Sequence, residues 1–225
     1  MPHFDIVKKN DPDVTFRVSK IQADFDVKLE HSNERFVGDI EMPNDWQIGV
    51  IVGASGTGKS TIAKELFDEE LINGFEYKAK SVVDDMPKSA KMDDITKMFY
   101  AVGFGSVPSW LKPYSVLSNG EKMRVDLARA LLEKDFVCFD EFTSVVDRQV
   151  AQTACIAINK AIKKTGKKFV AVSCHYDILD WLQPDWVFDT NKMQCFFGNA
   201  HDRKNNMKSE NAIAVSGQSL GVIII

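Results

Sequence analysis

Residues 53–61 form a glycine-rich segment that constrains this chain more than any other. The segment matches the pattern G-x-x-x-x-G-K-[ST] and consists of Gly53, Ala54, Ser55, Gly56, Thr57, Gly58, Lys59, Ser60 and Thr61. An apolar run at 48–52 leads into it, and a helix-like stretch at 61–67 leads out. In this context glycines let backbone N–H groups turn inward around an anion, and the helix N-terminus adds its positive end.

The segment therefore predicts a phosphate-binding loop for a nucleoside triphosphate. Lys59 would lie against the β- and γ-phosphates, and the Ser60 hydroxyl would help to hold Mg²⁺. A glycine-rich turn that binds nothing is the alternative. The preceding strand-like run and the following helix-like run both argue against it.

Length and charge set the broad class. With 225 residues, 44% hydrophobic and 27% charged, the chain suits one α/β domain, with room for a small appended subdomain. A net charge of −4 does not support a surface that grips nucleic acid, although a local basic stripe would be compatible with it.

Neither end of the chain reads as a targeting or membrane segment. No apolar run approaches the roughly 18 residues that span a bilayer, and residues 1–5 lack the basic-then-apolar pattern of a secretory signal. We expect a cytoplasmic protein. The four cysteines lie far apart and show no zinc-ligand spacing, so we expect buried reduced thiols rather than a redox or zinc site at Cys138, Cys155, Cys174 and Cys195.

Apolar periodicity predicts two parts. Alternation at 14–18 and 23–27, followed by an apolar–polar run at 35–40, predicts an antiparallel β part over 14–47. From residue 48 onward strands and helices alternate, which predicts a mainly parallel sheet flanked by helices. The expected strands are 48–52, 77–83, 136–139 and 168–173, and the expected helices are 61–67, 93–102, 117–132, 148–164 and 178–182.

Two acidic residues follow the apolar run at 136–139. Asp140 and Glu141 lie where a buried parallel strand would end. A pair of acids at a strand end can also simply cap the next helix, but a phosphate loop upstream favours a catalytic role. In its order and spacing with the loop, this segment resembles the Walker B strand of ABC-type ATPases. The resemblance extends from about residue 14 to 197 and implies a P-loop fold of that family.

That resemblance assigns roles to the acidic pair. Asp140 would hold Mg²⁺ through water, and Glu141 would polarise the attacking water. Residues 117–121 resemble the family's signature, usually L-S-G-G-Q. In the family this segment contacts ATP bound to a second subunit, which here implies roles for Ser118, Asn119, Gly120 and Glu121.

The signature segment has a second interpretation. Ser118 and Glu121 also form a capping box, with serine at the N-cap and glutamate at N3. The two interpretations are compatible, because a helix N-terminus is where a γ-phosphate would dock. Glutamate in place of the usual glutamine is more similar to the DNA-maintenance branch than to transporters.

Three further residues are weaker candidates. Asp147, just after Glu141, resembles the D-loop aspartate at the dimer interface, and His175, after a strand, is similar to the switch histidine that bonds the γ-phosphate. Phe25 is a candidate for stacking on adenine, although a core role in a strand is an equal alternative. A lone histidine is also often a surface or core residue.

The chain departs from the family in ways that weaken docking to a membrane permease. Asp84 stands near the place of the usual metal-contacting glutamine, so it would be a substitute ligand or the contact would be missing. Phe142 replaces the proline typical of transporter subunits, and the helical subdomain at 86–120 is short.

The sequence therefore predicts an ABC-type ATPase domain over 1–198 and a flexible tail over 199–225. It would bind ATP and Mg²⁺, hydrolyse ATP and close as a homodimer around two nucleotides, with an unidentified protein partner. It resembles soluble or acetyltransferase-linked prokaryotic and mobile-element members. The alternatives are a transporter subunit, a DNA-associated repair or defence ATPase, and a dimerisation module with little turnover; Glu141 and His175 argue against the last.

Overall fold

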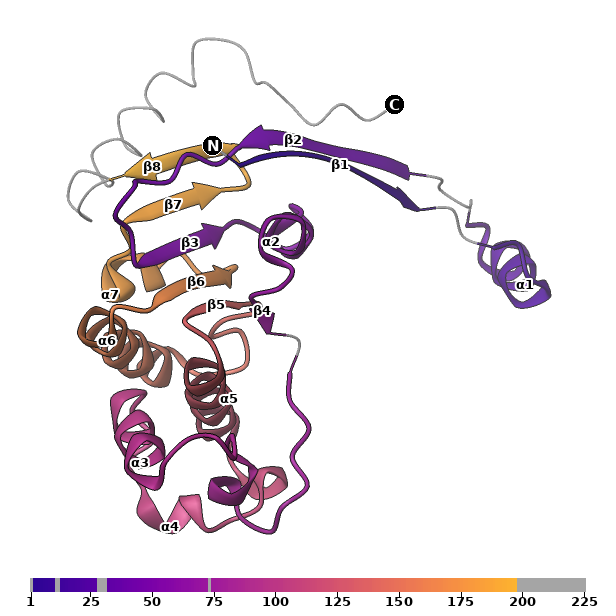
Figure 1. Cartoon of the computed structure of the whole chain (residues 1–225). Helices are drawn as coiled ribbons and strands as arrows, with labels where there is room; N and C mark the ends of the chain where they lie inside the picture. Colours follow the sequence, from indigo (N-terminus) through magenta and orange to yellow (C-terminus); the bar gives the residue numbers. More distant parts are fainter. Residues whose placement is uncertain (1, 11–12, 28–31, 73, 198–225) are drawn as a thin grey trace.

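A six-stranded sheet with the order β4-β5-β6-β3-β7-β8 forms the centre of the molecule (Figure 1). The computed structural model describes residues 2–10, 13–27, 32–72 and 74–197. All neighbouring strands of this sheet are parallel except β7 and β8. The strands are β3 (Ile48–Val52), β4 (Leu71–Ile72), β5 (Phe136–Phe139), β6 (Lys168–Ser173), β7 (Trp186–Asp189) and β8 (Gln194–Phe197). The mainly parallel sheet expected from the sequence is confirmed.

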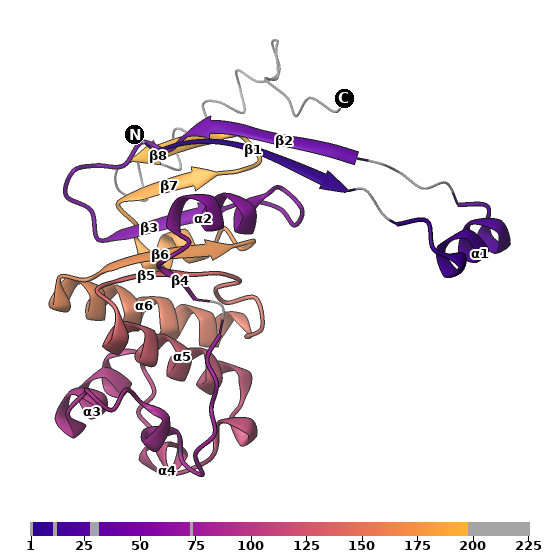
Figure 2. The same cartoon turned by 45° about the vertical axis from the view of Figure 1, so that its right-hand side comes forward.

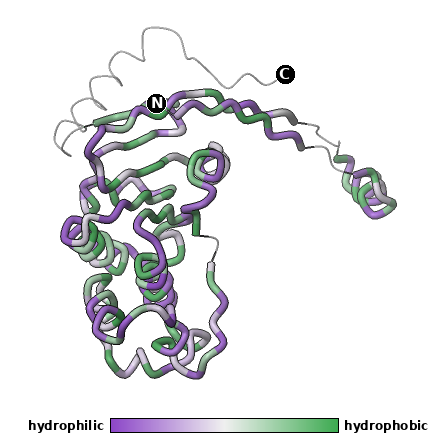
Figure 3. The backbone as a smooth tube through the Cα atoms, in the orientation of Figure 1, coloured by the Kyte–Doolittle hydropathy of each residue, from purple (hydrophilic) through white to green (hydrophobic). Residues whose placement is uncertain are grey.

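Helices and a hairpin cover the two faces of the sheet. Helices α5 (Asn119–Glu133), α6 (Arg148–Thr165) and α7 (Ile178–Leu182) pack on one face, and α2 (Lys59–Phe67) packs on the other. Because side chains alternate along a strand, Val50 joins the core under α5 and α6, and Ile51 joins the core under α2. Hydrophobic residues follow the strands of the sheet (Figure 3).

The N-terminal part is an antiparallel hairpin with a helix at its far end. Strands β1 (His3–Asn10) and β2 (Ser32–Asp39) pair antiparallel, and α1 (Phe16–Phe25) lies between them in the chain. Figures 1 and 2 show the hairpin crossing above α2 and carrying α1 well away from the sheet. The antiparallel character is confirmed.

The strands expected at 14–18 and 23–27 are wrong, because this segment is helical. α1 buries none of its residues, so no neighbouring strand completes a backbone ladder there. Local interactions decide instead: the Thr15 hydroxyl accepts the Val18 N–H at 3.3 Å, and Lys20 pairs with Asp24 one turn later at 3.0 Å.

The segment between β4 and α5 forms the helical part of the molecule. It contains η1 (Val82–Asp85), α3 (Met92–Ala101), α4 (Val107–Trp110) and η2 (Tyr114–Val116). The strand expected at 77–83 is wrong: the Asp85 carboxylate accepts the N–H groups of Lys78 and Ala79, which leaves them no need of a strand partner. The buried side of α3 was predicted correctly and consists of Ile95, Met98 and Phe99, with Val102 just beyond the helix.

The cysteines in the described residues are free thiols. Burial raises the pKa of the Cys155 thiol to about 12 and that of Cys138 further, so both are structural thiols rather than reactive ones. Within the described ranges, none of the helices has the length and apolar character required to cross a membrane. The tail expected at 199–225 lies outside the described residues.

Candidate functional site

The glycine-rich segment joins the end of β3 to the start of α2. Gly56 and Gly58 have φ angles of +85° and +84°, a region that glycine occupies without strain. At Gly58 a Cβ would lie 2.7 Å from the Phe36 ring, and at Gly53 one would lie 2.1 Å from the Thr190 hydroxyl. The loop therefore requires these glycines for close packing as well as for its turn.

Lys59 lies buried at the first position of α2, with 8% of its surface exposed. Its Nζ donates to the Ala54 carbonyl at 2.6 Å, and the Thr57 hydroxyl donates to the same oxygen at 2.8 Å. An ammonium has three donors, so this one bond leaves donors for phosphate oxygens. Gly58, the N-cap residue, offers no side-chain oxygen to the helix N–H groups.

The loop is braced from the turn that follows β7. The Thr57 and Thr190 hydroxyls lie 2.5 Å apart, and the Ala54 N–H donates to the Asn191 side-chain oxygen at 3.1 Å. Sequence reasoning missed Thr190 and Asn191 because β7 itself was not predicted. No local pattern marks these residues, which meet the loop only through the parallel pairing of β3 and β7.

The acidic pair lies at the carboxyl end of β5. The Asp140 carboxylate accepts the Glu141 N–H at 2.8 Å, and Glu141 has a positive φ of 52°. The next residue is anchored: Phe142 is fully buried, and its N–H donates to the Val172 carbonyl of β6 at 2.8 Å. This anchored turn leaves the Glu141 side chain exposed at the sheet edge.

His175 follows the carboxyl end of β6, the strand between β5 and β3. Its backbone N–H donates to the Ser173 hydroxyl at 3.2 Å. Because parallel strands end at the same edge of a sheet, the structure brings the phosphate loop, the acidic pair and His175 to one edge. These are the groups that the sequence assigned to nucleotide binding and catalysis.

The signature segment begins α5 with a complete capping box. The Ser118 hydroxyl accepts the Glu121 N–H, and the Glu121 carboxylate accepts the Ser118 N–H at 2.9 Å and the Ser109 hydroxyl at 2.8 Å. These hydrogen bonds lower the pKa of Glu121, and the bond from the Ser118 backbone N–H contributes most. At Gly120 a Cβ would lie 2.8 Å from Val150 of α6, so a larger residue would not fit there.

Comparison with known proteins shows which family the chain resembles. No protein-family model matches the chain. It is 33% identical over 135 residues to an ABC transporter ATP-binding protein of Haemophilus influenzae, covering 47% of this chain and 55% of that protein. It is 26% identical over 183 residues to the energy-coupling factor transporter ATP-binding protein EcfA1 of Staphylococcus aureus, covering 63% and 66%. Both relatives are ATP-binding cassette proteins, and because this chain is similar to them we refer to it below as the cassette.

The cassette thus spans between 55% and 66% of the length of these two relatives. A solved dimeric structure of the cassette MJ0796, in a post-hydrolysis state bound to ADP and Pi, is similar in fold. The TM-score is 0.56 at 14% sequence identity, and the match covers 72% of this chain and 89% of that one.

Asp147 of the cassette caps a helix. Its carboxylate accepts the N–H groups of Gln149 and Val150 at 3.0 and 2.9 Å, at the start of α6. The next residue, Arg148, makes a two-bond pair with Asp177, two residues beyond His175. The segment predicted as a D-loop is therefore tied to the segment that carries His175.

Two predicted site residues of the cassette are not brought to the phosphate loop. Phe25 is the last residue of α1 and has 69% of its surface exposed, so it has no core role in a strand. Figures 1 and 2 show α1 at the far end of the hairpin. Asp84 lies in η1, where the Ser81 hydroxyl donates to its carboxylate and the neighbouring Val82 N–H bonds to Lys112. The structure thus places Asp84 in the helical part, and its role as a metal ligand stays a prediction.

The residues of the cassette fit Mg²⁺ held together with a nucleotide. Ser60 presents an exposed hydroxyl in the first turn of α2, and Asp140 presents a half-buried carboxylate. Among the described residues no group of three or more His, Cys, Asp or Glu could hold a metal alone. Mg²⁺ is usually bound by one or two protein oxygens with phosphates and waters, so this donor set suits it.

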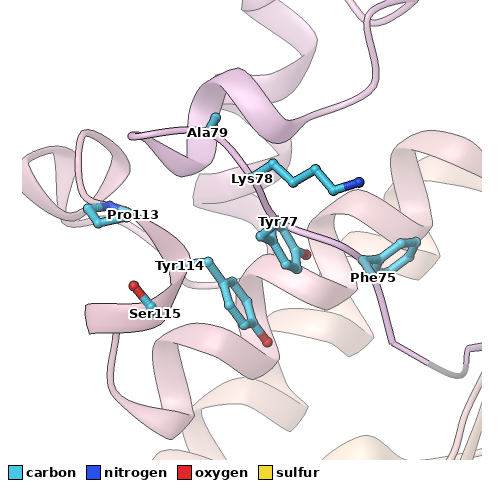
Figure 4. Close-up of a pocket in the computed structure, with 7 residues that line it drawn as sticks. All are labelled: Phe75, Tyr77, Lys78, Ala79, Pro113, Tyr114 and Ser115. Atoms are coloured by element: carbon cyan, nitrogen blue, oxygen red, sulfur yellow. The ribbon is translucent and has the colours of Figure 1, made fainter.

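A separate hollow of about 480 Å³ lies in the helical part of the cassette (Figure 4). Two of its lining residues, Tyr77 and Tyr114, stack with ring centroids 3.9 Å apart. Both hydroxyls donate to the Asp126 carboxylate at 2.7 Å, and burial of that carboxylate raises its pKa. The hollow is therefore supported by a satisfied polar network, away from the phosphate loop.

Proposed function

We propose that this cassette binds MgATP at residues 53–61 and hydrolyses it to ADP and phosphate. One observation carries the proposal: the phosphate loop, the acidic pair Asp140 and Glu141, and His175 follow β3, β5 and β6 and so lie at one sheet edge. Phosphoryl transfer needs little covalent chemistry from the protein and depends on positioning and charge. This edge supplies both.

Each group has a role that follows from its chemistry. Lys59 supplies positive charge to the β- and γ-phosphates, and Ser60 with Asp140 holds Mg²⁺, which supplies charge neutralisation when bound. Glu141, exposed on its anchored turn, orients the attacking water and accepts its proton. His175 donates to the γ-phosphate.

The same proposal includes a homodimer in which residues 118–121 of one copy contact the nucleotide of the other. Two observations support it: α5 presents a preformed N-terminus, and MJ0796 is described as dimeric in a state with ADP and Pi. An ATP-bound dimer and an open ADP form would then be two populations shifted by the γ-phosphate.

The test compares the wild-type protein with Glu141→Gln. Wild-type protein should release phosphate from ATP in the presence of Mg²⁺ but not of EDTA. Glu141→Gln should bind ATP, lose about 10²- to 10⁴-fold in turnover, and form a dimer visible by light scattering. Glu65→Gln, an exposed glutamate on α2, is the matched control and should keep wild-type turnover. Full turnover by Glu141→Gln would contradict the assignment of the carboxylate.

A second candidate is the ATP-binding subunit of a membrane transporter. The observation that favours it is that the relatives from Haemophilus influenzae and Staphylococcus aureus are both named as ATP-binding proteins of transporters. Under this proposal a tagged chain should sediment with membranes together with an integral membrane protein encoded beside it. Recovery of all the protein without any membrane partner would contradict it.

A further inference from the structure

The residue after His175 is hydrogen-bonded to the turn that braces the phosphate loop. The Tyr176 hydroxyl donates to the Asp189 carboxylate at 3.1 Å and accepts from the Asn191 side-chain nitrogen at 2.9 Å. The side-chain oxygen of Asn191 in turn accepts the Ala54 N–H at 3.1 Å. A continuous chain of hydrogen bonds therefore runs from the His175 segment to the phosphate loop.

This chain fixes the orientation of the Asn191 amide. Asp189 is 2% exposed, and the same carboxylate oxygen also accepts the Asn191 backbone N–H at 2.9 Å. With its only proton given to Asp189, the Tyr176 hydroxyl can only accept from Asn191. The amide nitrogen must then face Tyr176 and the amide oxygen must face Ala54. A flipped amide would set two donors against each other.

Ala54 is the point where the chain of bonds meets the predicted phosphate ligand. Its carbonyl accepts from the Lys59 ammonium at 2.6 Å, and its N–H is the group held by Asn191. Displacement of Ala54 would therefore displace the bond that orients Lys59. On its other side the His175 segment is held by the two-bond pair of Asp177 with Arg148.

We propose that Tyr176 and Asn191 are positioning residues that couple the His175 segment to the phosphate loop. The coupling deepens the proposed ATPase function and rests on it for its effect on turnover. It makes the geometry of Lys59 depend on the position of the segment that senses the γ-phosphate. Neither residue touches the reacting atoms in this role.

Four variants test the coupling. Tyr176→Phe removes the hydroxyl and keeps the ring, Asn191→Ala removes the amide, and the double variant completes a cycle. Tyr100→Phe removes the hydroxyl of a tyrosine that is 58% exposed in the helical part, and it is the matched control. The measurements are hydrogen exchange of the 53–58 segment without nucleotide, KM and kcat for MgATP, and the melting temperature.

The coupling predicts effects on the loop that do not add. Each single variant should speed exchange in the 53–58 segment and raise KM by about two- to tenfold, the range that one neutral hydrogen bond supports. The double variant should match the larger single effect, because both changes break one chain of bonds. A defect that only lowers stability reduces the active fraction, which lowers kcat and leaves KM unchanged.

The outcomes separate this proposal from the proposed function. If wild-type protein hydrolyses ATP but Tyr176→Phe matches Tyr100→Phe in exchange and KM, the coupling is overturned and the function stands. Multiplicative effects in the double variant would also overturn it. If wild-type protein fails to hydrolyse ATP while exchange in the loop still rises in both single variants, the structural link stands and the ATPase assignment falls.

Discussion

Helices α2 and α5 both begin at a predicted nucleotide contact, yet their N-termini are built in opposite ways. At α2 the N-cap is Gly58, in the left-handed region and without a side-chain bond to the helix. At α5 the N-cap is Ser118, which exchanges hydrogen bonds with Glu121 in a complete capping box. The first N–H groups of a helix have no partner in the backbone of that helix. Of these two helices, α5 has side-chain partners for them at its N-terminus and α2 has none.

The difference indicates that the two helix N-termini have different roles. An uncapped N-terminus with a buried lysine suits a ligand that brings its own oxygens, whereas a capped one is stable before any ligand arrives. Removal of the ammonium at the start of α2 should therefore act mainly on nucleotide binding. Changes at the start of α5 should act mainly on stability and on pairing with a second copy.

Lys59→Ala should give the largest effect. Loss of the ammonium removes charge-assisted hydrogen bonds to phosphate, so affinity for ATP measured by calorimetry should fall by about ten- to a hundredfold or more. The melting temperature should change little. Lys64→Ala, an exposed lysine on the same helix, is the control and should bind normally. An unaltered affinity for ATP in Lys59→Ala would contradict nucleotide binding at the N-terminus of α2.

Gly58→Ala should combine two costs. The residue has a positive φ, and the new Cβ would lie 2.7 Å from the Phe36 ring. Gly166→Ala is the matched control, because its φ is also positive but no atom of the described residues outside its own neighbours lies within 4 Å of the added Cβ. We expect Gly58→Ala to lower the free energy of unfolding by about 1–3 kcal/mol and Gly166→Ala by about 1 kcal/mol, both from urea denaturation. Equal losses would show that Phe36 yields without cost.

Ser118→Ala should lower stability at α5. Loss of a serine N-cap costs about 0.5–2 kcal/mol, measurable as a lower urea midpoint. Ser89→Ala, an exposed serine in the helical part, should leave the midpoint unchanged. Affinity of the monomer for ADP should stay as in the wild type, because Ser118 is not part of the phosphate loop. A large loss of ADP affinity would contradict the division between the two termini.

Glu121→Gln should give the smallest effect and a dependence on pH. The Ser118 N–H and the Ser109 hydroxyl hold the pKa of Glu121 below its ordinary value, near 4.3 for a free glutamate. The carboxylate therefore stabilises the fold fully above that ordinary pKa, and this contribution is lost as pH falls through the lower pKa of the folded state. Urea midpoints of wild type and variant should differ at pH 7 and converge in acid. A constant difference would rule out the carboxylate as its source.

Apolar periodicity predicted several strands and helices of the core correctly, and it failed where tertiary contacts determine the secondary structure. The expected strands at 48–52, 136–139 and 168–173 and the helices that follow them are present. Strands β1, β4, β7 and β8 were missed, and β4 has only two residues, too few to show a period. The alternation at 14–27 misled because α1 buries none of its residues in the part of the chain that the structure describes, so its apolar residues mark no buried face.

The candidate site shows the same limit. Short runs of consecutive residues, each after an expected strand, predicted the site residues Lys59, Asp140, Glu141 and His175. Thr190, Asn191 and Tyr176 were not predicted, because their part in the site consists of side-chain bonds between segments far apart in the chain. The sequence also did not show that Asp84 lies in the helical part, because the fold of the chain after β4 depends on contacts such as the bond from the Val82 N–H to the Lys112 carbonyl.

The sequence by itself determined the phosphate loop and the capped start of α5. Both depend on neighbours a few residues apart, within reach of backbone sterics and local hydrogen bonds. Only the tertiary structure decided which segments surround the loop. The order β5-β6-β3-β7 sets the acidic pair, His175 and Asn191 around residues 53–58. That order arises from burial of both sheet faces and from strand pairing across more than a hundred residues, which no local pattern encodes.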